Sequence, residues 1–166
     1  MKEYFDVLDC NRKSLDYKKE RGEKLLDHEY NMGAEDFIIC DNKILMTQRS
    51  PEKSHPGMWE VPGGCSQAGE ESFDTLVREM SEEVGVKVDS SNTRYIGTKL
   101  YKKQFVDIYE TVTSIDIHDI KVQEEEVSEV RFVGKEEFEE LVSQEKVVPS
   151  VLNRFHSFKD LLSLDW

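Results

Sequence analysis

Basic residues are scarce in this sequence: 22 Lys and Arg stand against 35 Asp and Glu, a formal net charge of −13 over 166 residues. A broad surface for a nucleic-acid polymer needs an excess of cations, so we expect no such partner. The only cysteines are Cys10, Cys40 and Cys65, an odd number without a CxxC pair, which disfavours a disulfide framework or a zinc site. Long apolar runs are also missing, as is the apolar core of a secretory signal, so we expect a cytoplasmic protein without membrane contact.

One domain over residues 1–166 is the simplest organisation, because no repeat, low-complexity tract or flexible linker divides the sequence. Residues 1–31 are irregular in pattern and are a possible N-terminal arm or edge strand. Strand and helix patterns intermix after them, which predicts the α/β class, a mixed β-sheet flanked by helices. The expected strands are Phe37–Cys40, Ile44–Met46, Tyr95–Tyr101, Phe105–Thr113 and Val130–Val133, and the expected helices are 72–84, Glu136–Val142 and Ser150–Leu162.

The helix over residues 72–84 has the clearest pattern. Its apolar residues recur at intervals of three and four, which predicts one buried stripe. Ser72 is a suitable N-cap and Gly85 a suitable stop. The stripe consists of Phe73, Leu76, Val77, Met80 and Val84.

Three glutamates accompany this stripe. Glu79 and Glu83 are four residues apart on one flank of it, and Glu82 lies one step further round the helix. Like charges at this spacing repel, and partial burial raises the cost. A divalent cation removes the conflict, and Mg²⁺ prefers hard oxygen ligands together with water and phosphates. The residues alone leave open a surface helix that is simply rich in glutamate.

The spacing around these glutamates favours the metal site. Residues 64–86 begin with Gly64, and five intervening residues separate it from Glu70. Seven more precede Arg78 and Glu79, which are followed by Glu82, Glu83 and then a Gly-Val pair. This pattern is similar to the signature box of the Nudix hydrolase family at every specified position, and WEVPGG before it matches as well.

The resemblance implies an α/β/α sandwich that hydrolyses a small-molecule diphosphate linked to another moiety, with Mg²⁺ or Mn²⁺. It implies that Glu79, Glu82 and Glu83 bind metal, joined by a backbone carbonyl at Gly63 or Gly64. Glu79, Glu83 and Arg78 are then the catalytic candidates, with Arg78 orienting a glutamate. Gly64 and Glu70 are expected on the substrate side of the site, where Glu70 supports the loop before the helix.

A basic loop before the box points to one branch of the family. Arg49 and Lys53 have the spacing of two residues that contact the substrate diphosphate in isopentenyl-diphosphate isomerase, although both could equally be surface residues. An isomerase is therefore one alternative, since Cys65 lies near that enzyme's catalytic cysteine, although the residues around Cys65 differ and the full glutamate set favours hydrolysis. A non-catalytic module that only binds a diphosphate ligand is the second alternative.

The general base is expected outside the box. Glu125 or Glu126, in the acidic run before the strand at Val130–Val133, is the natural candidate, although such runs are often solvated turns. A homodimer is possible, and the identity of the diphosphate is not readable, because specificity depends on loop geometry.

Overall fold

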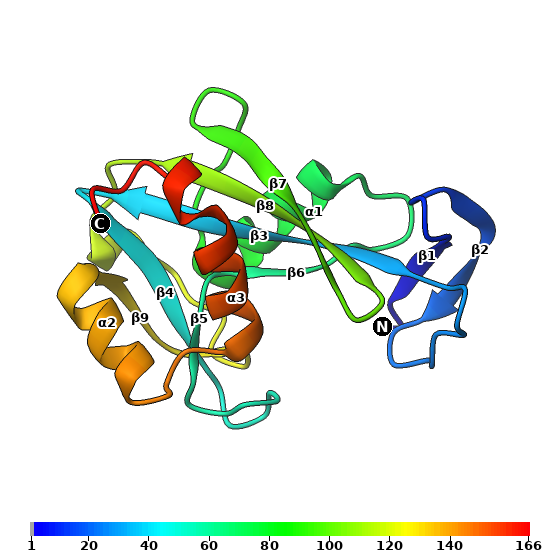
Figure 1. Cartoon of the computed structure of the whole chain (residues 1–166), viewed down its shortest axis with the longest axis horizontal. Coiled ribbons are helices and arrows are strands. Elements are labelled where there is room, and N and C mark those ends of the chain that lie inside the picture. Colours follow the sequence, from blue (N-terminus) through cyan, green and yellow to red (C-terminus); the bar gives the residue numbers. More distant parts are fainter. Residues whose placement is uncertain (1) are drawn as a thin grey trace.

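The computed structural model describes residues 2–166, in which nine strands and three α-helices form an α/β sandwich with a small separate hairpin (Figure 1). The elements are β1 (Tyr4–Leu8), β2 (Ser14–Glu20), β3 (Asn31–Cys40), β4 (Lys43–Arg49), β5 (Trp59–Glu60), β6 (Gly63–Cys65), α1 (Ser72–Glu79), a π-helical turn (Met80–Val84), β7 (Thr93–Tyr101), β8 (Gln104–Val112), a 3-10 turn (Ile117–Asp119), β9 (Val127–Val133), α2 (Lys135–Ser143), α3 (Pro149–Phe158) and a second 3-10 turn (Lys159–Leu161).

The main sheet is mixed. Its order is β5-β4-β3-β8-β7, with β6 paired to β3 and β9 paired to β4. β3 and β8 run parallel over nine residue pairs, whereas β3–β4, β4–β9 and β7–β8 are antiparallel. The seven strands form one continuous layer that carries the loops of the site.

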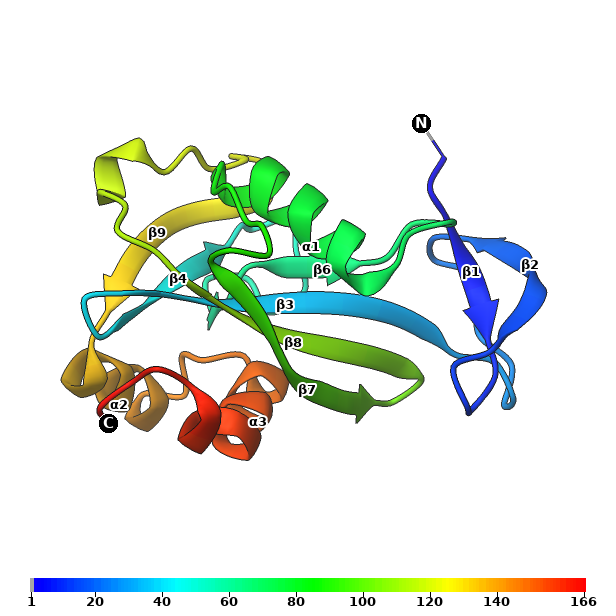
Figure 2. The same cartoon turned by 90° about the horizontal axis from the view of Figure 1, so that it is seen from above.

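Helices cover both faces of this sheet: α1 lies on one side and α2 and α3 on the other (Figure 2). Because side chains alternate along a strand, Phe37 and Ile39 of β3 enter the core under α2 and α3, while Ile38 enters the core under α1. The predicted sandwich is confirmed. None of the helices in residues 2–166 is long and apolar enough to cross a membrane.

The helix that carries the signature residues departs from its prediction in three respects. Val77 is 40% exposed, whereas Leu76, Met80 and Val84 are fully buried, so the stripe is narrower than expected. Ser72 is not the N-cap: the helix begins there, Glu71 caps it, and the Ser72 hydroxyl hydrogen-bonds the Tyr109 hydroxyl at 2.6 Å. The last turn, Met80–Val84, is π-helical rather than α-helical, which the spacing of residues could not reveal.

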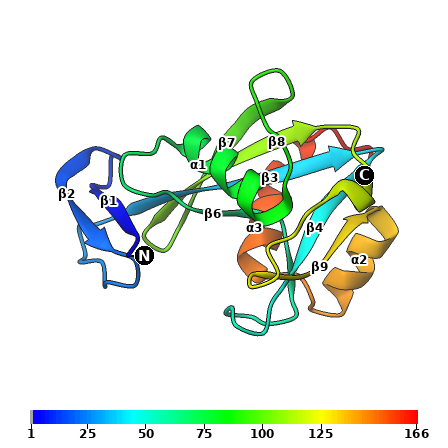
Figure 3. The ribbon, with the colours of Figure 1, turned by 180° about the vertical axis from the view of Figure 1, so that it is seen from behind.

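The N-terminal residues, for which an arm or an edge strand was expected, form two strands of their own. β1 and β2 form a separate two-stranded antiparallel sheet beside the start of β3 (Figures 1 and 3). Arg12 fastens it to the main sheet with two 2.8 Å hydrogen bonds to the buried Asp107 of β8. The Ala68 N–H adds a 2.8 Å bond to the Tyr4 carbonyl. The hairpin is thereby held against the loop that precedes α1.

Candidate active site

Two adjacent glycines bring the backbone of β6 against the signature helix. A Cβ on Gly64 would lie 2.2 Å from Glu79 Oε1, so only glycine lets this carboxylate approach. Gly63 has a φ of +157°, and a Cβ there would lie 2.3 Å from the backbone carbonyl of Ala34. The Gly63 N–H donates to Glu83 Oε2 at 2.9 Å. The glycine pair therefore defines where two of the three signature glutamates lie.

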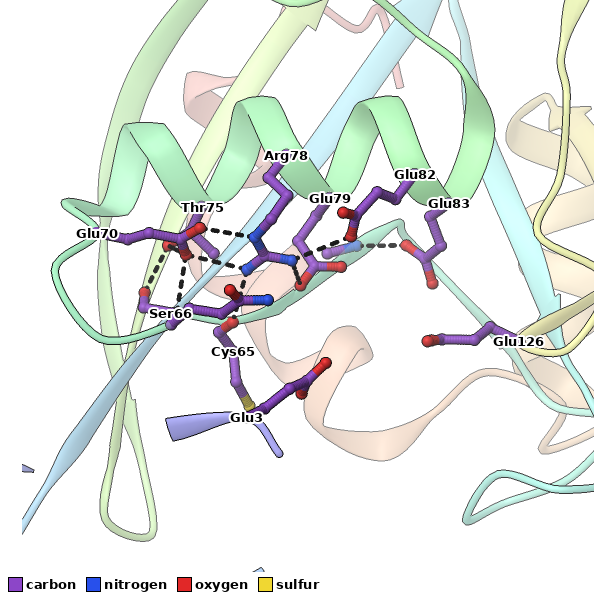
Figure 4. Close-up of polar contacts among 12 residues, drawn as sticks. Glu3, Cys65, Ser66, Glu70, Thr75, Arg78, Glu79, Glu82, Glu83 and Glu126 are labelled. Atoms are coloured by element: carbon purple, nitrogen blue, oxygen red, sulfur yellow. Dashed lines mark hydrogen bonds and ion pairs between the residues drawn. The ribbon is translucent and has the colours of Figure 1, made fainter. Parts of the chain in front are cut away.

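Arg78 organises the carboxylates on the exposed side of the helix (Figure 4). Its Nε and Nη2 donate to the two oxygens of Glu70 at 2.6 and 3.0 Å, the fork geometry typical of arginine. Nη1 donates to Glu79 at 2.8 Å and to Glu82 at 3.3 Å, and Nη2 reaches the Cys65 carbonyl at 3.1 Å. Hydrogen bonds to Glu70 above all raise the pKa of Arg78, which stays cationic.

Glu83 is the most buried of the signature glutamates, with 1% of its surface exposed. Burial raises its pKa to about 8, although Lys53 and the Gly63 N–H act in the opposite direction. Burial also raises the pKa of Glu79, against the effect of Arg78. The backbone carbonyl of Glu83 accepts from the Gln123 N–H at 3.1 Å, so the π-helical turn is tied to the segment that carries Glu126. A nearby cation would offset the cost of keeping these carboxylates ionised.

The ammonium group of Lys53 shows where such a cation is favoured. Its Nζ lies 3.0 Å from Glu126 Oε2 and 3.4 Å from oxygens of both Glu60 and Glu83, so three separate segments contribute one carboxylate each. Burial lowers the pKa of Lys53, but these carboxylates outweigh it and raise that pKa overall. Arg49 lies beside this group and pairs with the other oxygen of Glu60.

The residues of the site supply the kinds of donor that suit a divalent ion. The donors are carboxylate oxygens and backbone carbonyls, the hard ligands that Mg²⁺ and Mn²⁺ take. Within residues 2–166, no three His, Cys, Asp or Glu side chains stand close enough together to ligate one ion as they are. In this arrangement Glu83 pairs with Lys53, and Glu79 and Glu82 pair with Arg78. The ligand chemistry fits an ion, provided that Lys53 withdraws from the carboxylates.

A single cleft of about 490 Å³ gathers most of the residues expected from the sequence. Its lining includes Arg49, Lys53, Gly63, Gly64, Arg78, Glu79, Glu82 and Glu126. Glu83 contacts this cleft through Lys53, and Glu70 lies behind Arg78. Glu125 is not brought to the cleft: its side chain is exposed, and its backbone carbonyl accepts from the Ser50 hydroxyl at 2.7 Å. The structure thus separates the two neighbouring base candidates.

The model of the NUDIX domain family matches residues 33–156. The protein belongs to the Nudix hydrolase family. A Nudix hydrolase of Listeria innocua is 31% identical over 166 residues, which cover 98% of each chain. The 8-oxo-dGTP diphosphatase of Proteus vulgaris is 44% identical over 54 residues, covering 31% of this chain and 47% of that protein. The crystal structure of DR0079 from Deinococcus radiodurans is similar with a TM-score of 0.74 and 19% identity, covering 88% of this chain and 92% of that one.

Members of this family are pyrophosphohydrolases, so the protein is an enzyme of that class. Several residues of this Nudix hydrolase's cleft were not anticipated from its sequence. Glu60 stands in WEVPGG and pairs with both Arg49 and Lys53. Arg154 of α3 forms a buried pair with Glu35 of β3, also in the cleft lining. Arg21 and Glu3 of the N-terminal hairpin line the cleft as well. Only Glu60 had a local signal, its place in the WEVPGG segment three residues before Gly63.

Proposed function

We propose that this Nudix hydrolase cleaves the diphosphate bond of a nucleoside-diphosphate-linked compound or a related organic pyrophosphate, with Mg²⁺ or Mn²⁺. One observation carries the proposal: an ammonium group is held by three carboxylates in the cleft that also contains Glu79 and Glu82. A group of anions that gathers one cation is suited to binding a metal–diphosphate complex.

In this proposal Glu79, Glu82 and Glu83 hold the metal, together with the carbonyl of Gly63. A bound divalent ion would neutralise negative charge on the diphosphate oxygens and would lower the pKa of the attacking water. Arg78 keeps Glu79 in orientation through its 2.8 Å hydrogen bond, and Glu70 holds the other side of the same guanidinium.

The remaining polar groups act on substrate and water. Glu126 reaches the cleft from outside the signature box and accepts the proton of the attacking water. Lys53, once released from its carboxylates, binds phosphoryl oxygens, and Arg49 beside it does the same. Gly64 leaves space where the diphosphate approaches the backbone.

The test is a screen of diphosphate compounds with Mg²⁺ and Mn²⁺, with identification of each product. Metal-dependent release of phosphate or of a nucleoside monophosphate, lost in Glu83→Gln while the folded circular-dichroism spectrum is kept, is the expected result. Isopentenyl diphosphate belongs in the panel, because formation of the dimethylallyl isomer without phosphate release would establish the isomerase instead. Binding of ligands without turnover of any compound would indicate a non-catalytic module.

Two further expectations stay predictions: a cytoplasmic location and a possible homodimer. Light scattering of the purified chain across a concentration series measures the second directly.

A further inference from the structure

The N-terminal hairpin encloses a second, smaller pocket beside the main cleft. This side pocket has a volume of about 180 Å³ and lies between residues of the hairpin, the start of β3 and the segment Cys65–Gln67. Glu3, Arg21 and Cys65 line both the side pocket and the cleft, so they stand where the two meet. In Figure 4 Glu3 lies beside Cys65, below the guanidinium of Arg78. The hairpin therefore forms a wall of the site although it lies before residues 33–156, which carry the family match.

The position of this wall is fixed by hydrogen bonds. The Gly69 N–H donates to Asp6 at 2.6 Å, and Arg12 reaches Asp107 across the sheet. The Arg21 N–H donates to the Glu3 carbonyl at 2.9 Å, which closes the open end of the hairpin. A hairpin held at both ends keeps Arg21 at the mouth of the side pocket.

Arg21 differs from Lys53, Arg78 and Arg154, three other cations that line the cleft. Lys53 and Arg78 each contact three carboxylates, and Arg154 is buried against Glu35. The Arg21 side chain is 57% exposed, and in the described chain its only side-chain hydrogen bond is to Glu3, at 2.5 Å. Several of its five N–H donors are therefore free for an anionic ligand.

Asn31 supplies the second observation. It lines the side pocket, and its side-chain carbonyl oxygen is buried without a hydrogen-bond partner among residues 2–166. Leaving a buried acceptor unpaired costs stability, which makes it a sign of a missing donor. A ligand seated in the pocket can provide that donor after a small movement of the amide.

We propose that the side pocket under the N-terminal hairpin binds the small, hydroxyl- or amino-bearing group attached to the substrate's diphosphate, with Asn31 accepting its hydrogen bond and Arg21 pairing with the adjoining phosphate. This rests on the proposed function and narrows its substrate class. A nucleobase combines such donors with an apolar face, which suits this pocket because its accessible lining is mostly apolar, with Phe5 and Leu25 among its residues. An isoprenoid chain has no donor for Asn31 and is disfavoured.

The experiment compares wild type with Asn31→Leu, Arg21→Gln and the control Lys18→Gln, a change of the same charge on the exposed surface of β2. Calorimetry measures the affinity for ADP-ribose, UDP-glucose, dGTP and isopentenyl diphosphate with Ca²⁺, and hydrolysis is assayed separately with Mg²⁺. We expect wild type to favour at least one of the first three compounds. Asn31→Leu and Arg21→Gln should each weaken that binding about tenfold, while Lys18→Gln binds as wild type does.

Thermal unfolding separates binding from structural roles. A structural Asn31 would lower the melting temperature when replaced, whereas removal of an unpaired buried acceptor leaves it unchanged or higher. Arg21→Lys should keep part of the affinity, because it retains the charge without the fork. Unchanged affinity in both pocket variants, or tightest binding of isopentenyl diphosphate, overturns the inference. Binding that depends on Asn31 and Arg21 without hydrolysis of any compound would support the inference and remove the proposed function.

Discussion

Alanine substitution at the two adjacent glycines should have opposite consequences for fold and for activity. At Gly64 the new methyl group would meet the end of the Glu79 side chain at 2.2 Å, more than 1 Å inside an ordinary contact. A flexible side chain can swing aside, so we expect a loss of stability under about 1 kcal/mol. Because displacement of a catalytic group by about 1 Å can cost roughly 100-fold in rate, turnover of Gly64→Ala should fall by about that factor.

At Gly63 the same methyl group would meet backbone instead. It would lie 2.3 Å from the Ala34 carbonyl oxygen and 2.8 Å from the Glu35 Cα, and both atoms belong to the central strand of the sheet. Overpacking costs roughly 1–3 kcal/mol and an unfavourable φ about 1–3 kcal/mol more. We expect Gly63→Ala to lose about 2–6 kcal/mol of unfolding free energy.

Urea denaturation gives the stability of both variants, and Mn²⁺ titration followed by electron paramagnetic resonance gives their metal affinity. Gly64→Ala should unfold near the wild-type midpoint and bind Mn²⁺ more weakly. Equal destabilisation of the two variants, or a Gly64→Ala enzyme with wild-type turnover and Mn²⁺ affinity, would refute the argument that Gly64 exists to admit the Glu79 carboxylate.

Three further predictions concern buried charge and proton transfer. Glu126→Gln should lower kcat at least tenfold, whereas Glu125→Gln should not; equal effects in steady-state assays would remove Glu126 as the base. Lys53→Met should raise KM about tenfold through the lost phosphate contact, yet tighten Mn²⁺ binding without substrate, since a competing cation is gone; unchanged Mn²⁺ affinity counts against the three-carboxylate arrangement. Burial raises the pKa of Asp36 from 3.8 to about 7. Between these two pH values Asp36 is protonated in the folded state and ionised in the unfolded state, so the free energy of unfolding falls as the pH rises through this range. The side chain of Asp36→Asn is neutral at every pH, so the unfolding free energy of this variant relative to wild type should rise by about 2–4 kcal/mol from pH 5 to pH 8. An equal difference between the urea midpoints of the two proteins at both pH values would contradict this.

Local patterns predicted much of the fold correctly. The β7–β8 hairpin, with its turn at Lys102 and Lys103, follows from two alternating apolar runs around a polar break. α2 was expected over Glu136–Val142 and spans Lys135–Ser143. These elements are determined by neighbours in the sequence, so periodicity is sufficient to find them. The fixed spacing of the signature residues indicated the family for the same reason.

Features that depend on distant contacts were not predictable. No local pattern indicates that β3 pairs in parallel with β8. In this pairing Asn31 lies opposite Gln104, about seventy positions later in the sequence. The carbonyl of Glu83 in the π-helical turn accepts from the distant Gln123, and the gathering of carboxylates around Lys53 brings together β5, the π-helical turn and the segment before β9. The assignment of metal, base and substrate roles to these residues stays a prediction until the experiments above are done.

The ion pair between Arg12 and Asp107 limits how far the chain can be truncated without loss of stability. A fragment trimmed to residues 33–156 would retain Asp107, which is 3% exposed, and lose the guanidinium that neutralises it. It would also lose Ser163, whose hydroxyl donates to the buried Glu110 carboxylate at 3.0 Å. Glu110 would then keep only part of its hydrogen-bonding set, including the bond from Arg94. An unpaired buried carboxylate costs several kcal/mol, a large part of the stability of a domain this size. The stretch that the family model matches is therefore shorter than the stretch we expect to fold independently, because Arg12 supplies a counter-charge that the sheet requires.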